Sequence, residues 1–398
     1  MIMSSAFFSS QPSPQEILER MEGFPSWFEV DLDALSHNLR EIRERVGVEV
    51  MAVVKNNAYG YGLIPVTAHL SREGVNWFMV AKLKEAIEIR DAGIPGHVLN
   101  MGPAFTERQY LEVVEKGITQ TVYTMDQAEK LSAAASQAGA EAETFVKVDT
   151  GLRRIGVDHA AAPELIERVC GLPGVKVAGI YSTFMQSPER DGEQLDRLLH
   201  VDGELRRRGI RIGIRSMASS DAVFHNPEGW LDMVRPGAAL YGVYPGPGDR
   251  ESGLDLRQAL SFKARIEHVK WVEEGDSVTY WGRFIAPKRM RIGTLHVGFY
   301  DAIPREMANR ARFRMEGEFR QGIGSVSLNH CLLDLTSSEA SVGDIVEVIG
   351  REGENSLTRI AEASGWMVYS LMNHLNPTTP RVYTEGGRPV ALLDPGSA

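Results

Sequence analysis

Lys55 is the first residue whose position suggests chemistry. It closes the largely apolar run 49–54 and precedes a stretch rich in Asn and Gly at 56–62. The run predicts a buried strand, and the stretch predicts the turn that ends it. Proteins with α/β folds bind ligands at the carboxyl ends of their strands, where a desolvated lysine can lose its proton and attack a carbonyl carbon to form a Schiff base. For this residue alone, the alternative is an ammonium group that marks a strand end and points into water.

A second cluster has the residue types that bind phosphate. Hydroxyl side chains including Ser219 and Ser220 follow the seventh predicted strand, and Arg235 and Gly237 stand at the eighth. Barrel enzymes often bind a phosphate group at these two positions, through hydroxyls, backbone N–H groups and a nearby arginine. We therefore predict a phosphate site here. The alternative is that the two serines only cap a helix.

A third cluster, residues 147–156, places charge after another apolar strand. It contains Lys147, Asp149, Arg153 and Arg154. Such a cluster is either a solvated surface turn or a charged network behind an active site, in which one arginine faces the ligand. Since Lys55 is predicted to lie at the same rim, the second interpretation is favoured.

The elements that must position these clusters alternate along the chain between about residues 27 and 245. Short apolar runs alternate with amphipathic helical patterns such as 82–92, 107–116 and 126–138. The eight predicted strands are 50–55, 77–81, 97–101, 120–123, 143–149, 175–182, 211–217 and 237–241. Eight such units predict an α/β fold of the parallel (β/α)8, TIM-like type, with a doubly wound open sheet as the alternative.

After about residue 255 the pattern changes to extended runs separated by turns, which predicts a mostly β domain. Its predicted strands are 261–272, 290–297, 312–315, 325–327, 332–335 and 345–349, with one helix at 357–363. We divide the chain into a weakly structured N-terminal extension (1–25), a barrel domain (26–255) and a C-terminal β domain (256–398). Residues 26–32 are a candidate strand of the second sheet.

Composition excludes several classes of protein. The chain has 398 residues and a net charge of −10, which argues against binding nucleic acid through phosphate contacts. No apolar run approaches the ~20 residues of a membrane span, and no signal peptide is recognised at the N-terminus. The two cysteines, Cys170 and Cys331, favour a reduced, cytoplasmic setting. No histidine spacing predicts a metal site, although His330 stands out because it follows Asn329, discussed below.

Together the clusters resemble one family, the alanine racemases, which are pyridoxal-phosphate enzymes built on a barrel and a β domain. The resemblance extends from about residue 26 to 383, and the motifs occur in family order. They are Val53–Gly60, Lys147–Gly151 with Arg154, Arg235–Gly237 with Leu240–Gly242, Gly275–Tyr280, Gly298–Asp301 and Pro380–Tyr383.

The resemblance implies a cofactor, pyridoxal 5′-phosphate, and a role for each matching residue. Lys55 would hold the cofactor covalently, and Arg235 would face its pyridine nitrogen, where a permanent cation disfavours protonation of the ring. Arg154 would approach the ring hydroxyl or the substrate carboxylate, and Lys147 matches a position that can be carbamylated. The residues expected to hold the phosphate are Tyr59, Ser219, the backbone of Gly237, and Tyr369.

The resemblance also implies a two-base reaction. Lys55 would serve one face of a planar carbanion, and Tyr280 of a partner subunit the other, in a head-to-tail homodimer. The expected activity is racemisation of alanine or another small amino acid such as serine. Departures from the family pattern are Thr183 in place of histidine, Leu328 and Asn329 in place of a Met-Asp pair beside the substrate carboxylate, and Phe299 in place of an entrance tyrosine.

Two alternatives stay open because these departures surround the substrate. One is another reaction on the same fold, by a decarboxylase, lyase or epimerase. The other is a catalytically impaired protein that still binds the cofactor. The retained pair of Lys55 and Tyr280 favours the racemase, since a decarboxylase needs no second base of this kind.

Overall fold

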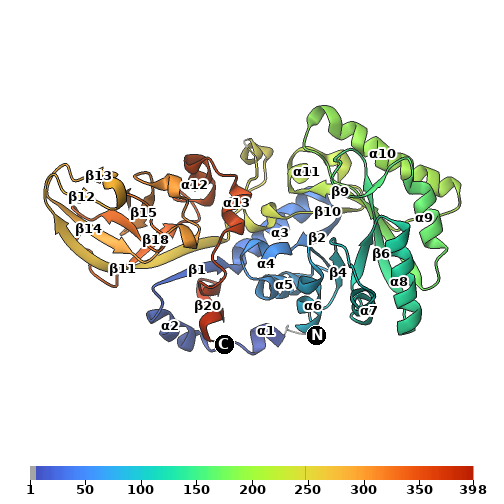
Figure 1. Ribbon diagram of the computed structural model, residues 1–398, viewed down its shortest axis with the longest axis horizontal. Coiled ribbons are helices and arrows are strands. Elements are labelled where there is room, and N and C mark those ends of the chain that lie inside the picture. The colour runs from blue at the N-terminus through green and yellow to red at the C-terminus, as the bar shows by residue number, and fades with distance from the viewer. Residues whose placement is uncertain (1–5, 247, 398) are drawn as a thin grey trace.

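The computed structural model describes residues 6–246 and 248–397, which form a parallel barrel and a mostly β domain (Figure 1). The barrel strands are β2 (Glu49–Val53), β3 (Trp77–Val80), β4 (His97–Asn100), β5 (Thr119–Val122), β6 (Ala142–Asp149), β8 (Val175–Tyr181), β9 (Ile214–Ser219) and β10 (Met233–Arg235). All neighbours are parallel, and the pairings β5–β6 and β10–β2 close the ring. The predicted (β/α)8 barrel is confirmed, and the open sheet is excluded.

Helices cover the outside of the barrel and follow the expected signals. Helices α7 and α8 each begin with a threonine cap and a reciprocal glutamine, Thr106 with Gln109 and Thr124 with Gln127. Gly139 ends α8 in the left-handed conformation. The covering helices are α3 (Leu32–Val46), α5 (Leu63–Arg72), α6 (Leu83–Asp91), α7 (Glu107–Glu115), α8 (Met125–Ala138), α9 (Ala162–Cys170), α10 (Pro188–Arg207) and α11 (Ser220–His225).

The prediction for the eighth strand was wrong. The strand is β10, at Met233–Arg235, and the predicted run 237–241 instead forms the 3₁₀ helix η2 (Ala238–Tyr241). Pro236 has no N–H group to continue the sheet, so the strand ends after three residues. The apolar residues that follow are buried as a helical turn and not as a strand.

The second domain is a nine-stranded sheet. Its strands are β1 (Ser26–Asp31), β11 (Leu260–Val272), β14 (Met290–Leu295), β15 (Arg312–Met315), β16 (Glu318–Ile323), β17 (Cys331–Asp334), β18 (Ile345–Ile349), β19 (Arg381–Glu385) and β20 (Arg388–Leu393). Strand β1 pairs antiparallel with β11 and parallel with β19. The predicted strand 325–327 was wrong, because these residues lie in the loop after β16.

Smaller elements complete this domain. Helices α12 (Leu357–Ser364) and α13 (Val368–Asn373) pack together, and a short hairpin joins β12 (Ser277–Val278) to β13 (Phe284–Ile285). Figure 1 shows this hairpin at the outer end of the domain, away from the barrel. The rings of Phe28 and Phe262 stack at 4.3 Å within one apolar core that continues from the barrel into the sheet.

The prediction of a weakly structured N-terminal extension was also wrong for the residues that are described. Helices α1 (Ala6–Ser9) and α2 (Pro14–Glu22) lie there, and α2 has a complete capping box between Ser13 and Glu16. Ile17 is fully buried against Trp27 and Leu392. The capping box and the buried isoleucine order a segment whose composition alone suggested a tail; residues 1–5 lie outside the described part.

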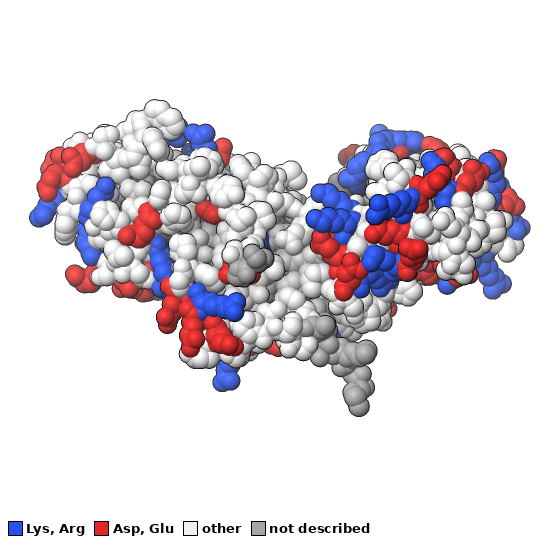
Figure 2. Space-filling view, turned by 60° about the horizontal axis from the view of Figure 1, so that its bottom comes forward, with Lys and Arg blue, Asp and Glu red and all other residues white. Residues whose placement is uncertain are grey.

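Charges of both signs intermingle at the two ends of the molecule, and uncharged surface covers much of the middle of the face in Figure 2. No field of a single sign appears on this face, in agreement with the ordinary composition of the chain. Among the described residues, no helix is long and apolar enough to cross a membrane.

Candidate active site

The chain turns sharply in a left-handed sense directly after Lys55. The segment α4 (Lys55–Tyr59) contains four consecutive non-glycine residues at positive φ, Asn56 (56°), Asn57 (56°), Ala58 (51°) and Tyr59 (54°). Left-handed backbone costs roughly 1–2 kcal/mol per residue, and asparagine tolerates it better than alanine or tyrosine. Strain of this kind persists only where the surroundings impose it, and it is concentrated at functional sites.

Side chains from distant parts of the sequence hold this turn. The Arg381 guanidinium is fully buried and donates to the carbonyl oxygen of Gly60 at 2.7 Å, and the Tyr383 hydroxyl donates to that of Tyr61 at 2.8 Å. From the barrel side, Glu85 accepts a hydrogen bond from the Asn57 N–H at 3.0 Å. The motif around Arg381 therefore fixes the direction in which the chain leaves Lys55.

The environment of Lys55 disfavours its charged form. Burial lowers the pKa of Lys55, the positive charges of Arg154 and Arg235 lower it further, and Glu85 opposes them. An amine with a depressed pKa is more often present as the neutral nucleophile. Figure 1 shows α4 where the barrel meets the C-terminal domain, so Lys55 stands at the carboxyl end of β2.

Behind Lys55 lies a network of buried cations. Arg235 donates to Ser216 Oγ at 2.5 Å and to the Ser182 carbonyl oxygen at 2.6 Å, and burial lowers its pKa to about 10. Lys147 donates to Thr183 Oγ1 at 2.9 Å, and Arg235 reaches the same hydroxyl at 3.3 Å. The small hydroxyl of Thr183 therefore accepts from two cations, which a histidine side chain at this position would not reproduce.

Lys147 is the most desolvated cation of this network. Burial holds the pKa of Lys147 well below its usual value, and Arg235 and Arg154 add to the effect. Its ammonium group lies 4.4 Å from the centre of the Tyr181 ring. Arg154, by contrast, is exposed and forms no hydrogen bond or ion pair within residues 6–246 and 248–397, so its guanidinium is available to a ligand.

A small cradle lies at the ends of β9 and β10. A Cβ atom built on Gly237 would stand 2.4 Å from Tyr59 Oη, so only glycine lets that hydroxyl approach the backbone. The rings of Tyr59 and Tyr369 lie 6.4 Å apart. Burial raises the pKa of Tyr59, and it raises that of Tyr369 to about 12, so both hydroxyls stay protonated as donors at neutral pH.

The two serines beside the cradle have different surroundings. Ser220 Oγ accepts from the N–H groups of Gly237 at 2.8 Å and Ala239 at 3.3 Å, which ties α11 to the end of β10. Ser219 is the N-cap of α11, but its side chain makes no capping hydrogen bond. The alternative interpretation, that this serine only caps a helix, does not hold for Ser219, and its hydroxyl has no partner among the described residues.

The structure does not bring Tyr280 to Lys55 within one chain. Tyr280 follows β12 in the outer hairpin, and its side chain is 65% exposed. Its neighbours Thr279 and Trp281 have φ values of 64° and 62°, a region that favours glycine, and the Ser325 hydroxyl donates to the Tyr280 carbonyl oxygen at 3.1 Å. Tyr280 is thus presented outward on a strained turn.

The residues expected beside the substrate also lie on this outward surface. Leu328 and Phe299 are exposed, and Asn329 is half-buried. The N–H of Phe299 donates to the Ser327 carbonyl oxygen at 2.9 Å, which joins the two loops into one unit. The single chain therefore groups Leu328, Asn329 and Phe299 with each other and not with Lys55.

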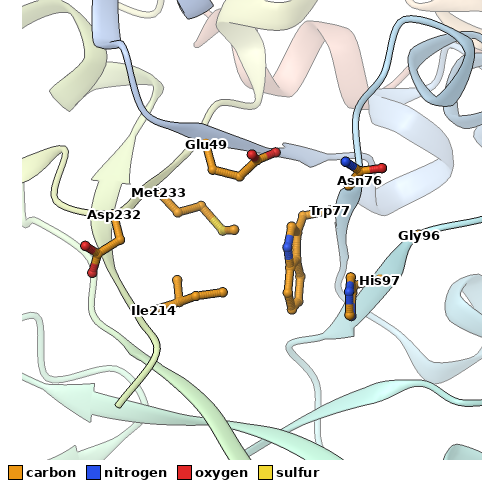
Figure 3. Close-up of a pocket in the computed structure, with 8 residues that line it drawn as sticks. All are labelled: Glu49, Asn76, Trp77, Gly96, His97, Ile214, Asp232 and Met233. Carbon is orange, nitrogen blue, oxygen red and sulfur yellow. The ribbon is translucent and has the colours of Figure 1, made fainter. Parts of the chain in front are cut away.

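A cavity of about 350 Å³ lies at the opposite end of the barrel (Figure 3). Glu49, Trp77 and His97, which begin strands β2, β3 and β4, line it, and Figure 3 shows the Trp77 and His97 rings face to face. Conserved chemistry in such barrels lies at the carboxyl ends of the strands, whereas this end contributes to stability. This cavity is not part of the Lys55 site.

One residue that builds the site, Glu85, was missed in the sequence. It accepts a hydrogen bond from the Asn57 N–H, and no spacing signal identifies such a contact. Ser220 was named among the predicted phosphate residues, but its bonds to the N–H groups of Gly237 and Ala239 were not foreseen. Arg381 and Tyr383 belonged to a recognised motif, but their contacts with Gly60 and Tyr61 span more than three hundred positions. The available signal was an arginine followed two residues later by a tyrosine, at Arg381 and Tyr383.

The fold and site define a barrel enzyme with a buried lysine of depressed pKa and an arginine network behind it. Comparison with known families agrees. Residues 30–245 match the family described as alanine racemase, N-terminal domain, and residues 259–383 match alanine racemase, C-terminal domain.

Individual relatives match along nearly their whole length. The alanine racemase of Desulforamulus reducens is 36% identical over 368 residues, covering 90% of this chain and 99% of the relative. That of Clostridium perfringens is 33% identical over 380 residues, covering 93% and 98%. Among solved structures, alanine racemase from Clostridium difficile 630 superimposes with a TM-score of 0.88 at 29% identity, covering 94% and 99%. The chain belongs to the alanine racemase family and is an amino-acid racemase.

Proposed function

We propose that this enzyme uses pyridoxal 5′-phosphate to interconvert the L and D forms of alanine, or of another small amino acid such as serine. The observation that carries the proposal is Lys55, an amine of depressed pKa at the carboxyl end of a barrel strand, facing Arg154 and Arg235. The names of the relatives support alanine as the first substrate to test.

The residues present fit the cofactor. The glycine cradle at Gly237, with the hydroxyls of Tyr59 and Tyr369 beside it and the unpartnered Ser219 at the end of β9, suits a phosphate group. Arg235 would face the pyridine nitrogen. When bound, the cofactor supplies an electron sink for the carbanion formed at Cα. Arg235 remains cationic at neutral pH, which disfavours protonation of that nitrogen and limits side reactions.

The chain's own residues would then move the proton. In one direction, neutral Lys55 would accept the Cα proton on one face while the Tyr280 hydroxyl of the partner subunit donates a proton to the other face; in the reverse direction, the Tyr280 phenolate would accept and the Lys55 ammonium would donate. Arg154, which has no competing hydrogen bond within the described residues, would orient the substrate carboxylate. Leu328 and Asn329 of the partner subunit would lie beside the same carboxylate. Lys147 is proposed to be carbamylated, because burial lowers its pKa and so favours the neutral amine, the form that adds carbon dioxide.

The exposure of Tyr280 supports a two-chain site. In a head-to-tail homodimer, the outer hairpin of one subunit would cover Lys55 of the other, and the exposed side chains of Tyr280 and Trp281 would be buried between them. The free thiols of Cys170 and Cys331 support a cytoplasmic location, where thiols stay reduced.

Deuterium exchange tests the reaction. The purified enzyme, loaded with cofactor, is incubated with a panel of L-amino acids in deuterated water, and chiral chromatography with mass spectrometry reports inversion and Cα deuteration together. We expect both for alanine. Deuteration without inversion would indicate that the second base is lost. A lack of exchange with every amino acid would overturn the racemase in favour of a cofactor-binding protein without turnover.

Heterodimers test the shared site. Lys55→Ala and Tyr280→Phe subunits are co-expressed with different tags, and the mixed dimer is purified through both. If Tyr280 acts on its partner, one of the two sites keeps both bases and activity returns. If Tyr280 acts in its own chain, each site carries one lesion, so the mixed dimer stays as inactive as its parents.

A further inference from the structure

Three side chains with metal-binding atoms meet on the surface of the C-terminal sheet. They are Glu267, His296 and His330, and their ligand atoms all lie within 4.8 Å of one another. Glu267 Oε1 lies 2.9 Å from His330 Nε2, and Glu267 Oε2 lies 3.0 Å from His296 Nδ1. The two imidazole rings stand edge to face, with their centres 5.3 Å apart.

The sheet itself brings these residues together. Strand β11 pairs with β14, and β14 pairs with β17; Glu267 lies in β11, and the two histidines directly flank the ends of β14 and β17. His296 follows Leu295 and His330 precedes Cys331, and Leu295 and Cys331 are direct partners in the ladder. Glu267 lies where the β11–β14 register shifts, and such a bulge redirects a side chain. The ligands are far apart in sequence, so spacing motifs give no sign of them.

We propose that Glu267, His296 and His330 bind one divalent transition-metal ion of the zinc type. Two imidazoles and one carboxylate are a set that such ions accept, with water completing the coordination. Ligand atoms on a tetrahedral ion lie roughly 3.4 Å apart for metal–ligand bonds of about 2.0–2.1 Å. The separations from the two Glu267 oxygens, 2.9 Å to His330 and 3.0 Å to His296, need to widen by a few tenths of an ångström, and the two imidazole nitrogens, which lie within 4.8 Å of each other, reach this geometry through rotation of exposed side chains.

The site is open to solvent on one side. The side chains of His296, Glu267 and His330 are 46%, 36% and 45% exposed, so an ion can enter without unfolding the sheet and can keep water as a ligand. None of these groups belongs to the Lys55 site. The competing explanation is a hydrogen-bonded pair of histidines around one carboxylate with no metal, and binding measurements separate the two.

Metal binding would restrain the turn that carries Leu328 and Asn329, the residues proposed to lie beside the substrate. The Ser327 N–H donates to the His330 carbonyl oxygen at 2.9 Å and closes a turn that carries Leu328 and Asn329, and the Tyr300 N–H donates to the Leu328 carbonyl oxygen at 3.1 Å. An ion that ties His330 to β11 and β14 therefore restrains this turn. This consequence for activity rests on the proposed function, whereas metal binding does not.

Zinc titration by calorimetry tests the site. Cofactor-loaded enzyme without a histidine tag is dialysed against chelator, then titrated with Zn²⁺ alone, for the natural protein and for His296→Ala, His330→Ala and Glu267→Gln. We expect one ion per chain, bound more than about tenfold tighter than by any variant, since loss of even an outer partner of a metal ligand costs that much. His200→Ala is the matched control, because His200 pairs with Glu204 at 3.8 Å on a helix without a second histidine.

A second measurement guards against misfolding of the variants. Circular dichroism and Tm in chelator should match those of the natural protein, and added Zn²⁺ should raise the Tm of the natural protein and of His200→Ala only. Equal zinc affinity for the natural protein and the three ligand variants would overturn the proposal, as would saturation without a Tm increase. Because no substrate is present, the outcome is independent of the racemase assays. If the site binds zinc, Zn²⁺ should change KM in the natural protein and not in His330→Ala.

Discussion

The two sides of the proposed reaction are built in contrasting ways. On the Lys55 side, one chain supplies everything: Arg235 is buried and hydrogen-bonded, and the strained turn after Lys55 is held by Arg381 and Tyr383. On the opposite side, Tyr280 and Trp281 are 65% and 73% exposed. The first side is buried and braced within one chain, whereas the aromatic side chains of the second are exposed in the single chain.

Strain makes the same contrast visible in the backbone. Both regions contain non-glycine residues at positive φ, but side chains from the barrel and from the C-terminal strands fix the first. In the outer hairpin, the contacts come from a neighbouring loop of the same domain: Thr279 Oγ1 accepts from the Ser325 N–H at 2.7 Å, and the Ser325 hydroxyl donates to the Tyr280 carbonyl oxygen at 3.1 Å. Under the proposed function, the cofactor half of the site would be built by folding of one chain, whereas the opposing base would reach it only in the dimer.

Lys55→Ala should have the largest effect. Removing the amine takes away the covalent attachment and one base, so racemisation should fall by about 10⁴-fold or more, and the visible absorbance of the bound cofactor should change. Steady-state assays and absorbance spectra measure both. Lys176→Ala is the control, since Lys176 lies beside Glu143 at the amino end of β8, at the opposite end of the barrel from Lys55. An unchanged spectrum in Lys55→Ala would contradict the assignment.

Tyr280→Phe should have the second largest effect, because it removes only one of the two proposed bases. The variant keeps the cofactor spectrum, and racemisation falls by roughly 10²–10⁴-fold, the contribution of one general acid–base group. Exchange of the Cα proton should survive from one enantiomer and be suppressed from the other. Tyr300→Phe, on the same exposed surface, should keep exchange from both. Equal residual exchange from the two enantiomers in Tyr280→Phe would argue against two opposed bases.

Arg381→Met should destabilise the folded protein by about 3–5 kcal/mol. The substitution keeps an apolar stem, but it leaves buried carbonyl oxygens of Gly60, Asn376 and Thr379 without donors. Tyr383→Phe removes a single hydrogen bond and should cost about 1 kcal/mol. Urea unfolding with and without cofactor measures both. If the turn positions Lys55, cofactor affinity should fall more in Arg381→Met than in Tyr383→Phe. Unchanged cofactor affinity in both variants would mean that other contacts hold the turn.

The same contrast explains which features could be predicted from sequence. The barrel, its helices and the lysine at the end of β2 follow from local periodicity and caps, which short windows of sequence report. The eighth strand failed because Pro236 ends it after three residues, and the following apolar run looks the same whether it is extended or helical. The N-terminal extension failed because its order comes from Ile17 packing on Leu392, a contact between the two ends of the chain.

For the site, too, sequence motifs predicted which residues lie there but not how their side chains pair. Motifs located Lys55, Arg235 and Gly237 in the region where the structure has them. They did not reveal that Ser220 and not Ser219 bonds the Gly237 N–H, or that Thr183 receives both Lys147 and Arg235. Such pairings depend on side-chain direction, which sequence patterns report poorly.

The smallest expected effect is a pair of opposite pH shifts at Lys55. Glu85 raises the pKa of Lys55, and Arg154 lowers it. Glu85→Gln should therefore lower that pKa and Arg154→Gln should raise it. Because only the uncharged amine attaches the cofactor, the rate at which cofactor-free enzyme recombines with it rises with pH through this pKa. The midpoint of that profile should move to lower pH in Glu85→Gln and to higher pH in Arg154→Gln.

Of the two variants, Arg154→Gln is the simpler to interpret. Arg154 is exposed and forms no hydrogen bond or ion pair in the described part of the chain, so its removal changes charge without breaking structure. Glu85 accepts from the N–H groups of Asn57, Ala81 and Lys82, and a glutamine amide must turn a donor toward some of them. If the midpoint of the pH profile moves in the same direction in both variants, the turn has been distorted. If it moves in opposite directions, the change in charge is the cause. Opposite shifts would show that charges of the same chain, Glu85 and Arg154, set the pKa of Lys55.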